Sequence, residues 1–540
     1  MQAALVIDAL TLGEGQRDFT RDFIGAGPRM VAATLRACNL EARICRGEDF
    51  LRSSKGLAEK YDTCFVSGMT MDKPSVIAIA RAWKRASPGK PVIVGGPVAL
   101  EPGSLLRVAE IDAVVQGEAE RILFDAFASR GIAASFPGNP VPAGFITRAT
   151  MDRDSSGQQA NRWPDLPWVE QHVDPSIDLL GPAYGNAWAA RVYVELLRGC
   201  SNQRFARLGP KGDYTCKDCG YCDVSGDFQV DIPNPCVVGT RPGCGFCSTA
   251  AGSGPIRSFS IPYITRQVKT CIDIGCHRIV LGGSDVLEYQ RERLFKPGRT
   301  RPVMPPPPNH DALNVLVNQL LEFEAIKRGD VHVFAENIKA SLCDDESLSI
   351  LARLPGISVS IGVETGSDEQ LEHIGKSASV ASIKHAVELL NKHGIRYHAY
   401  FIHSLPGQTP RTVEESVCLM KWLEAAKAEK ITIYRFKPLP GTAFEGFRVT
   451  GAMLDDAEPM VAEAMRINGA GKERHVNTMV KVLIAERDFR DKEAAIAYML
   501  QGGPKVKLRD CRHLVNDKKV HVARITGVIS DKMTQGVLVE

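Results

Sequence analysis

Residues 192–200 read VYVELLRGC, an apolar, strand-like run that ends in an Arg-Gly-Cys turn. Five further apolar runs follow along the chain, separated by long amphipathic segments typical of helices: 278–281, 331–335, 359–363, 397–402 and 431–436. Six strands that alternate with helices predict a (β/α)6 partial barrel. Functional groups of such barrels lie at the carboxyl ends of the strands, so we expect chemistry where the Arg-Gly-Cys turn begins.

The first 145 residues show a second alternating pattern. Short apolar runs at 3–7, 42–45, 63–67, 91–94 and 113–115 are joined by helical segments. Strands that are apolar throughout predict a doubly wound parallel sheet with both faces covered. Ligands of such sheets bind beyond the carboxyl ends of the strands. The candidate binding residues there are Gly68, Thr70, Gly95, Gly96, Gly117 and Glu118. Ordinary turn chemistry explains any single glycine equally well.

Shifts in composition divide this α/β chain into four regions. Residues 1–145 form the doubly wound, Rossmann-like domain, 146–190 a linker or wrapping segment, 191–450 the partial barrel, and 451–540 a helical and then β-rich C-terminal domain. The 540 residues are 44% hydrophobic and carry a net charge of +3, which is typical of a soluble globular protein. We find no apolar run of 18 residues and no export signal. We therefore expect a cytoplasmic protein that binds no membrane, and the balanced charge makes nucleic acid an unlikely partner.

Cysteine is the unusual residue of this composition, because seven of the 15 cysteines lie within residues 200–247. Cys-x2-Cys spacing in a chain without an export signal indicates metal ligation. The seven cysteines can be divided into a group of three and a group of four. Three cysteines suit a metal site with one open coordination position, and four suit a closed metal site. The groups are Cys236, Cys244 and Cys247, and Cys200, Cys216, Cys219 and Cys222. The second group would hold zinc or an auxiliary iron–sulfur cluster. A single zinc ribbon with unused cysteines is the alternative for the cysteines alone.

The cysteine segment resembles the opening of a radical S-adenosylmethionine (SAM) enzyme. The resemblance is carried by the run 194–200, by Gly243-Cys244-Gly245-Phe246-Cys247 and by Arg257-Ser258. The family signature is CxxxCxxC, whose cysteines hold a 4Fe-4S cluster. Here the last pair is intact, but seven residues separate Cys236 from Cys244, and Cys200 lies farther upstream. The resemblance implies Cys236 as the first ligand, with Cys200 as the alternative.

Four strand-end motifs extend the resemblance over about 260 residues: LGGSD at 281–285, IGVETGS at 361–367 with IGK at 374–376, LPGQT at 405–409 and KPLPGT at 437–442. The family resemblance implies that the first motif, with Gly283 and Ser284, binds the amino group of SAM. It implies that Glu364 and Thr365 hold the ribose and carboxylate, and that Pro440 belongs to the cofactor site. Each motif is weak alone, but four in the right order at strand ends are specific.

The N-terminal domain resembles the cobalamin-binding domain that precedes many radical SAM proteins. The matching stretches are VIVGGP at 92–97, Glu101-Pro102 and DAVVQGEAE at 112–120. The motif Asp-x-His-x-x-Gly is absent, so no histidine of this domain is expected to bind cobalt from below. A degenerate Rossmann-like domain without a ligand is the alternative, and a dinucleotide is not indicated because no Gly-x-Gly-x-x-Gly follows the first strand.

The combined resemblance implies a cobalamin-dependent radical SAM C-methyltransferase. Such enzymes use a 5′-deoxyadenosyl radical to take hydrogen from an unactivated carbon, and methylcobalamin to methylate it. The Gly-Cys-Gly-Phe-Cys segment is similar to anaerobic, archaeal enzymes, one of which methylates a glutamine of methyl-coenzyme M reductase. We therefore expect a post-translational modification of a protein or peptide, here the alpha subunit of that reductase. The resemblance also implies an electron donor such as ferredoxin or flavodoxin.

Two competing functions come from other classes. A tRNA methylthiotransferase also has a radical barrel and a small β-rich tail, and residues 471–540 hold 14 Lys and Arg against 9 Asp and Glu. Such enzymes need three cysteines at strand-end loops of the first domain, whereas Cys38, Cys45 and Cys64 fall within a predicted helix and strands. The second competitor is a zinc-ribbon protein that binds RNA without catalysis.

Overall fold

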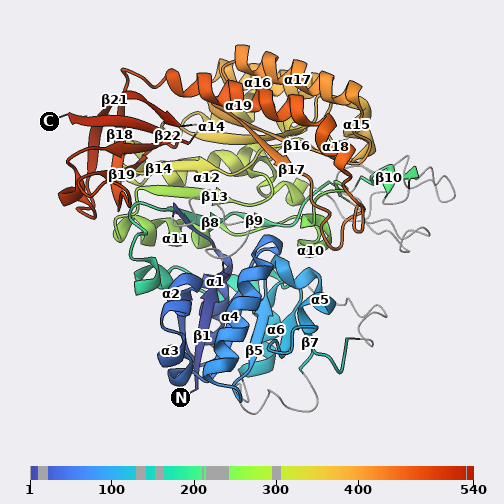
Figure 1. Cartoon of the computed structure of the whole chain (residues 1–540), viewed down its shortest axis with the longest axis vertical. Coiled ribbons are helices and arrows are strands. Elements are labelled where there is room, and N and C mark those ends of the chain that lie inside the picture. The colour runs from blue at the N-terminus through green and yellow to red at the C-terminus, as the bar shows by residue number, and fades with distance from the viewer. Residues whose placement is uncertain are drawn as a thin grey trace. The chain divides into compact units, whose positions relative to one another are not determined.

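The computed structural model describes residues 2–9, 22–128, 142–151, 163–202, 204–209, 212–213, 243–294, 306–530 and 532–539. The chain forms two compact units (Figure 1). The first unit comprises Met1–Tyr193 and Pro262–Ile274, and the second comprises Val194–Ile261 and Gly275–Glu540. No helix of the described residues is long and apolar enough to cross a membrane.

The first unit is built on a sheet with the strand order β3-β1-β4-β5-β6-β7. Its strands are β1 (Ala3–Asp8), β3 (Glu41–Arg46), β4 (Thr63–Ser67), β5 (Val92–Gly95), β6 (Ala113–Val115) and β7 (Phe145–Ile146). All neighbours are parallel except β6 and β7. Alternate residues of β1 enter different cores, Leu5 and Ile7 on one face and Ala4 and Val6 on the other. The doubly wound sheet predicted from the apolar runs is therefore confirmed.

Helices cover both faces of this sheet. The first core, with Leu5 and Ile7, includes residues of α2 (Gly47–Arg52), α3 (Ser54–Lys60), α4 (Lys73–Ala86) and α5 (Pro102–Leu106). The second core includes residues of α1 (Gly27–Ala37) and α6 (Ala119–Phe127). Two further helices belong to this unit, α8 (Leu166–His172) and α11 (Ile261–Asp273). The Tyr263 hydroxyl on α11 donates to the Val173 carbonyl at 3.1 Å, which holds α11 to this unit although it follows the first barrel strand in sequence.

The second unit contains the predicted six-stranded partial barrel. Its strands, in the order β17-β16-β15-β14-β13-β8, are β17 (Lys430–Arg435), β16 (Arg396–His403), β15 (Ser358–Glu364), β14 (His332–Ala335), β13 (Arg278–Gly282) and β8 (Arg191–Glu195). Neighbours from β13 to β17 are parallel. Strand β8 spans the boundary between the units, and its first-unit end pairs with β2 (Phe23–Ile24). The sheet remains open, since β17 and β8 are not paired with each other.

Helices alternate with these strands as predicted, and α16 and α17 run beside the strands they connect (Figure 1). They are α10 (Thr249–Ser253), α12 (His310–Leu321), α13 (Glu324–Lys327), α14 (Asp345–Leu351), α15 (Asp368–His373), α16 (Val380–Lys392) and α17 (Pro410–Ala425). Two small sheets accompany them: β9 (Leu197–Arg198) with β12 (Arg257–Ser258), and β10 (Leu208–Gly209) with β11 (Gly212–Asp213).

The C-terminal region adds two helices, α18 (Gly451–Asp456) and α19 (Glu458–Glu473), and a closed five-stranded barrel. The barrel order is β18-β19-β20-β22-β21, with β18 (Met479–Arg487), β19 (Ala495–Met499), β20 (Lys505–Leu508), β21 (Val520–Ser530) and β22 (Met533–Val539). Only β20 and β22 are parallel, which is the arrangement of an OB-fold. This fold hosts many functions and by itself assigns none.

The small barrel packs against the amino-terminal ends of the larger barrel's strands. Arg396, the first residue of β16, donates to the Gln501 carbonyl at 2.5 Å. The guanidinium of Arg278, the first residue of β13, lies 5.6 Å from the centre of the Tyr498 ring. The carboxyl ends of the larger barrel's strands, where chemistry is expected, lie at the opposite end.

Candidate functional site

Three of the predicted metal-binding cysteines gather beyond the end of β8. Asn202 lies between two of them: its backbone N–H donates to Cys200 Sγ at 3.4 Å and its side-chain amide donates to Cys244 Sγ at 3.1 Å. The same amide donates to the Gly375 carbonyl at 3.0 Å, which fixes its orientation. Cys247 follows in a tight turn, and the Cys247 backbone N–H donates to the Cys244 carbonyl at 2.9 Å. The structure therefore brings Cys200 together with the Cys244–Cys247 pair.

A glycine makes the Cys200 turn possible. Gly199 has φ +79°, a conformation that L side chains rarely adopt, and a Cβ there would lie 2.0 Å from the Pro255 carbonyl oxygen. The turn is further held by the Cys200 N–H, which donates to the Gly254 carbonyl at 3.1 Å. The Arg-Gly-Cys turn at which the sequence placed chemistry is thus a backbone feature that only glycine accommodates.

The environment of the thiols favours their neutral form in the absence of a metal. Burial raises the pKa of Cys200 to about 12 and the pKa of Cys244 to about 11. The positive charge of Lys339 opposes the rise at Cys200, and that of Lys376 opposes it at Cys244. Binding of a metal would replace the thiol protons, because metals bind thiolates.

The number of these cysteines matches a cluster with one open position. A cluster of four irons that is bound by three thiolates leaves one iron free for another ligand. Within the described residues, no group of three His, Cys, Asp or Glu side chains forms a site for a single metal ion. Cys200, Cys244 and Cys247 therefore fit an iron–sulfur cluster by their number and their chemistry.

A buried ion pair flanks Cys244 at the end of β15. Lys376 Nζ lies 2.6 Å from Glu364 Oε1, and their side chains are 13% and 8% exposed. The ammonium also lies 6.0 Å from the centre of the Phe246 ring. Glu364 adopts φ +67°, which is strained for a residue with a side chain. Buried strain of this kind is typical of functional sites.

The neighbouring Thr365 is occupied within the fold. Its hydroxyl donates to Gln370 Oε1 at 2.7 Å and lies 3.1 Å from Ser416 Oγ. Glu364 and Thr365, which were predicted together as SAM-binding residues, therefore differ in whether their side chains face the cysteines. The Glu364 carboxylate stands beside the cysteines with Lys376, whereas the Thr365 hydroxyl supports the loop that follows β15.

The predicted loop after β13 connects to the Cys200 turn through Glu288, which the sequence analysis missed. Gly283 has φ +156°, and a Cβ there would lie 2.9 Å from Leu197 Cγ. Ser284 Oγ donates to Glu288 Oε2 at 3.3 Å, and the Ser201 N–H donates to the same oxygen at 3.3 Å. Glu288 is fully buried and also pairs with Lys339. Burial raises the pKa of nearby Asp285 to about 7.

The loop after β17 returns to the cysteines. Pro440 is buried in it, and the Phe444 N–H a few residues later donates to the Gly245 carbonyl at 3.1 Å. Gly245 lies between Cys244 and Cys247, and a Cβ there would come within 2.6 Å of the Phe444 ring. The family-like motif at residues 437–442 therefore lies in a loop that closes against the cysteine turn.

In the first unit, the predicted glycines bring two strand-end loops into close contact. The Gly68 N–H donates to the Gly95 carbonyl at 3.2 Å, and a Cβ on Gly96 would lie 2.7 Å from the Gly68 carbonyl oxygen. Exposed Met69 and Met71, 43% and 41% accessible, rise from the same end of the sheet. These loops and the two methionines lie at the strand ends where ligands of doubly wound sheets bind, which is where a corrin would be held.

The other predicted residues of this unit lie at the same strand ends. The Thr70 hydroxyl donates to the Pro97 carbonyl at 3.4 Å. Gly117 has φ +95°, and Glu118 directly precedes α6. The chain contains no histidine before His172, so none of residues 1–145 offers an imidazole to cobalt.

Four predicted metal ligands, Cys216, Cys219, Cys222 and Cys236, lie outside the described residues.

The three cysteines of the first unit do not resemble a cluster site. Cys38 and Cys64 are buried, and burial raises the pKa of Cys45 to about 12 and that of Cys38 to about 11. Cys64 and Cys38 belong to the cores on opposite faces of the sheet, so the three cysteines do not gather at one strand-end site.

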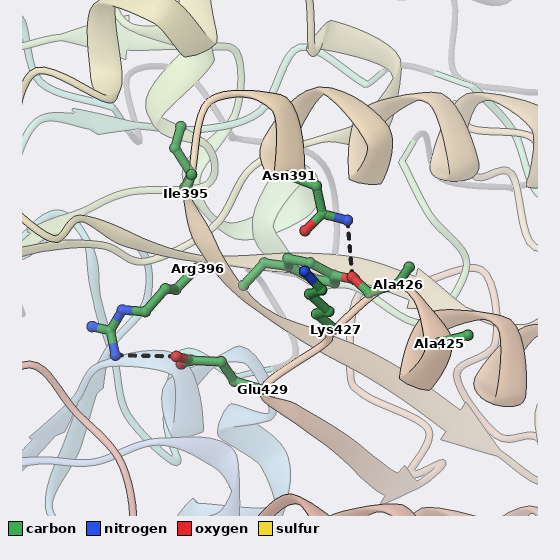
Figure 2. A pocket seen from close by; sticks show the side chains of 9 residues that line it. Asn391, Ile395, Arg396, Ala425, Ala426, Lys427 and Glu429 are labelled. Atoms are coloured by element: carbon green, nitrogen blue, oxygen red, sulfur yellow. Dashed lines mark hydrogen bonds and ion pairs between the residues drawn. The ribbon is translucent and has the colours of Figure 1, made fainter. Parts of the chain in front are cut away.

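A pocket of about 400 Å³ lies away from the cysteines (Figure 2). It is lined by residues at the starts of β16 and β17, among them Arg396 and Glu429, whose side chains are 3.1 Å apart. Asn391 donates to the Ala426 carbonyl at its rim. This is the amino-terminal end of the sheet, so the pocket does not belong to the cysteine site.

Comparison with known proteins agrees with this geometry. Residues 217–419 match the model of the radical SAM superfamily. The fold is similar to the radical SAM methyltransferase TsrM from Kitasatospora setae, solved with cobalamin and a [4Fe-4S] cluster, with a TM-score of 0.54 and 14% identity over 82% of this chain and 77% of that one. It is also similar to the cobalamin-dependent SAM radical enzyme OxsB, with a TM-score of 0.54 and 14% identity over 86% of this chain and 56% of that one. The expected α/β fold with Rossmann-like and radical SAM domains is therefore confirmed.

Two relatives match along almost the whole chain. The uncharacterized protein MK0932 of Methanopyrus kandleri is 37% identical over 100% of this chain and 96% of its own length. The uncharacterized protein MJ1620 of Methanocaldococcus jannaschii is 30% identical over 96% of both chains. The chain therefore belongs to the family of these two proteins, it contains a region that matches the radical SAM superfamily, and its fold is similar to those of cobalamin-dependent radical SAM enzymes.

Proposed function

We propose that this chain is a cobalamin-dependent radical SAM C-methyltransferase that acts on an unactivated carbon. The observation that carries the proposal is the meeting of Cys200 with the Cys244–Cys247 pair beyond the first barrel strand, where Asn202 donates to the sulfurs of Cys200 and Cys244. The likeness of the fold to TsrM and OxsB, which were both solved with cobalamin, supports cobalamin as the second cofactor.

In this proposal Cys200, rather than Cys236, is the first ligand of the 4Fe-4S cluster. The first and second cysteines of the family signature are then separated by 43 residues, where the signature itself has three. Four cysteines of the insertion remain, Cys216, Cys219, Cys222 and Cys236, which is the number that a closed zinc or iron–sulfur site needs. The three-plus-four division predicted from the sequence is kept, with Cys200 and Cys236 exchanged.

The chain's own residues would hold the cofactors and exclude water. The thiolates of Cys200, Cys244 and Cys247 would bind three irons and leave one for SAM, while Asn202 holds two of the sulfurs with N–H donors. Glu364, strained and buried, would accept hydrogen bonds from the ribose, and Lys376 would meet the carboxylate. When bound, the cluster and SAM supply a radical able to take hydrogen from carbon, and cobalamin supplies the methyl group.

The proposed substrate is a protein or peptide side chain, with the glutamine of methyl-coenzyme M reductase as the specific candidate. This proposal is supported by the source of the two relatives that match along almost the whole chain. Both come from organisms whose names mark them as methanogens, Methanopyrus and Methanocaldococcus. A ferredoxin or flavodoxin would deliver the electrons.

The test is reductive cleavage of SAM by the anaerobically reconstituted chain. With a low-potential chemical reductant, the wild-type chain should release 5′-deoxyadenosine, and Cys200→Ser should abolish the release. Cys236→Ser should retain it. Cys418→Ser is the control, because Cys418 is exposed on α17. Loss of cleavage in Cys236→Ser together with full cleavage in Cys200→Ser would refute the ligand assignment.

The methyl acceptor is tested separately. Synthetic peptides that carry the candidate glutamine should gain 14 mass units when cobalamin, SAM and reductant are all present, and none when cobalamin is left out. Methylation without cobalamin would refute the proposed methyl donor, and methylation of an arginine or another side chain instead would refute the glutamine.

A further inference from the structure

A network of buried charged residues contacts Ser201, the residue that follows Cys200. It consists of Glu288, Arg291, Lys339 and Ser201, of which Glu288 and Arg291 are fully buried and Ser201 is 2% exposed. Lys339 pairs with Glu288 and donates to Ser201 Oγ at 3.1 Å. Arg291 donates to the same hydroxyl at 3.1 Å, and its NH1 lies 3.7 Å from Glu288 Oε1. Ser201 is the residue after Cys200, so the network ends at the cysteine turn.

Charges this deeply buried carry a desolvation cost, and apolar side chains of similar volume often stabilise a fold as well or better. Here two cations share the carboxylate of Glu288. Both charges reach the residue after Cys200, because Lys339 donates to the Ser201 hydroxyl and Glu288 accepts from the Ser201 N–H. None of the three charged residues belongs to a strand-end motif identified in the sequence. They come from the short helical turns and loops after β13 and β14.

We propose that Glu288 and Lys339 are positioning residues that set the reduction potential of the cluster through Cys200. Glu288 ties the Ser201 N–H to Ser284, and so fixes the Cys200 turn against the loop after β13. Lys339 and Arg291 place positive charge beside Cys200, which stabilises the more negative, reduced state of the cluster. This inference rests on the proposed function, because it needs a cluster on Cys200. The redox event is the one-electron reduction of that cluster by an external donor.

The second ion pair shows why this one is singled out. Lys376 and Glu364 flank Cys244 as a matched pair, one cation to one carboxylate. At Cys200 two cations share the carboxylate of Glu288, and the buried carboxyl of Asp285 accepts a hydrogen bond from the Lys339 backbone N–H at 2.9 Å. Charges in a medium of low dielectric act strongly on a nearby redox centre, so a change in any one of them should be felt at Cys200.

The test is the midpoint potential of the cluster, measured by redox titration with electron paramagnetic resonance on the full-length chain without SAM. Lys339→Met should make reduction at least about tenfold less favourable, which is about 59 mV for a one-electron couple. Glu288→Gln keeps a hydrogen-bonding side chain and removes the negative charge, so its potential should shift in the opposite direction. Lys339→Arg keeps the charge and should stay near the wild-type value. Opposite shifts from the two halves of one pair are an electrostatic signature that a merely structural role would not produce.

The matched control is Lys392→Met, which removes a lysine 2.6 Å from Asp345 in a pair that is 60% exposed on both sides. It should leave the potential unchanged. Iron and sulfide content are measured on every variant. If all variants keep the cluster and the potentials of Lys339→Met and Glu288→Gln do not move apart, the inference is wrong while the proposed function stands. If Lys339→Met and Lys339→Arg both lose the cluster, the role of charge is refuted. A wild-type chain without a cluster would overturn both the inference and the proposed function.

Discussion

Removal of Lys376 should destabilise the second unit far more than removal of a surface lysine with the same ion-pair distance. Lys376 and Glu364 are 2.6 Å apart with side chains 13% and 8% exposed, whereas Lys392 and Asp345 are 2.6 Å apart with both side chains 60% exposed. Lys376→Met leaves the Glu364 carboxylate buried without its cation, a change that costs about 3–5 kcal/mol in comparable sites. The Glu364 side chain is only 8% exposed, so its unpaired carboxylate would be left with little contact to water.

The assay is urea unfolding of the metal-free chain, followed by circular dichroism, with the transition of the second unit analysed separately. Lys392→Met should cause no resolvable loss, since exposed pairs are screened by water and salt. The double variant Lys376→Met/Glu364→Gln should recover at least half of the loss, because the unpaired charge is gone. Equal losses in Lys376→Met and Lys392→Met, or no recovery in the double variant, would refute the argument from burial.

Three further predictions concern the turn, the base of the barrel and the insertion. Gly199→Ala should destabilise the chain by about 3 kcal/mol and lower its iron content, because it combines a left-handed φ with a Cβ 2.0 Å from the Pro255 oxygen. The control is Gly275→Ala, at φ +81° with no atom within 4 Å of the added Cβ. It should cost only about 1–2 kcal/mol and leave the iron content unchanged. Burial lowers the pKa of His332 to about 3, so the imidazole takes up a proton in the unfolded chain but not in the folded chain as the pH falls from about 6.5 towards 3. The free energy of unfolding should therefore fall by up to about 1.4 kcal/mol per pH unit over that range. His332→Leu should flatten this slope in unfolding measurements between pH 7 and 5, and an unchanged slope would contradict the assignment. Joint replacement of Cys216, Cys219, Cys222 and Cys236 by Ser should remove a second metal, seen by elemental analysis, and leave the EPR signal of the Cys200 cluster; loss of that signal would contradict the exchange of Cys200 and Cys236.

The sheets could be predicted from sequence because buried parallel strands leave a strong signal. Runs such as residues 3–7 and 278–281 are apolar throughout, and they became β1 and β13. The closure of the C-terminal strands into a barrel was not predicted. Closure depends on the pairing of β20 with β22 and of β18 with β21, which are separated by many residues and carry no local signal.

The site was predictable where a local motif marks it and not where distant segments meet. Glu364 and Ser284 could be proposed as site residues from the sequence because they lie in short motifs at strand ends. Cys200 was considered only as an alternative, since sequence distance hides that it folds against Cys244 across a long insertion. Glu288 and Lys339 were missed because an isolated Glu or Lys in a loop usually lies in solvent, and only the fold shows that these two are buried.

The central claim is that Cys200, Cys244 and Cys247 hold a radical SAM cluster in a chain that also binds cobalamin. The most direct measurement is the iron, sulfide and cobalamin content of the anaerobically purified chain, compared with the variant in which these three cysteines are replaced by Ser. We predict about one cobalamin per chain in both proteins and a loss of about four irons in the variant. Equal iron content in the two proteins, or a wild-type chain without cobalamin, would contradict the account.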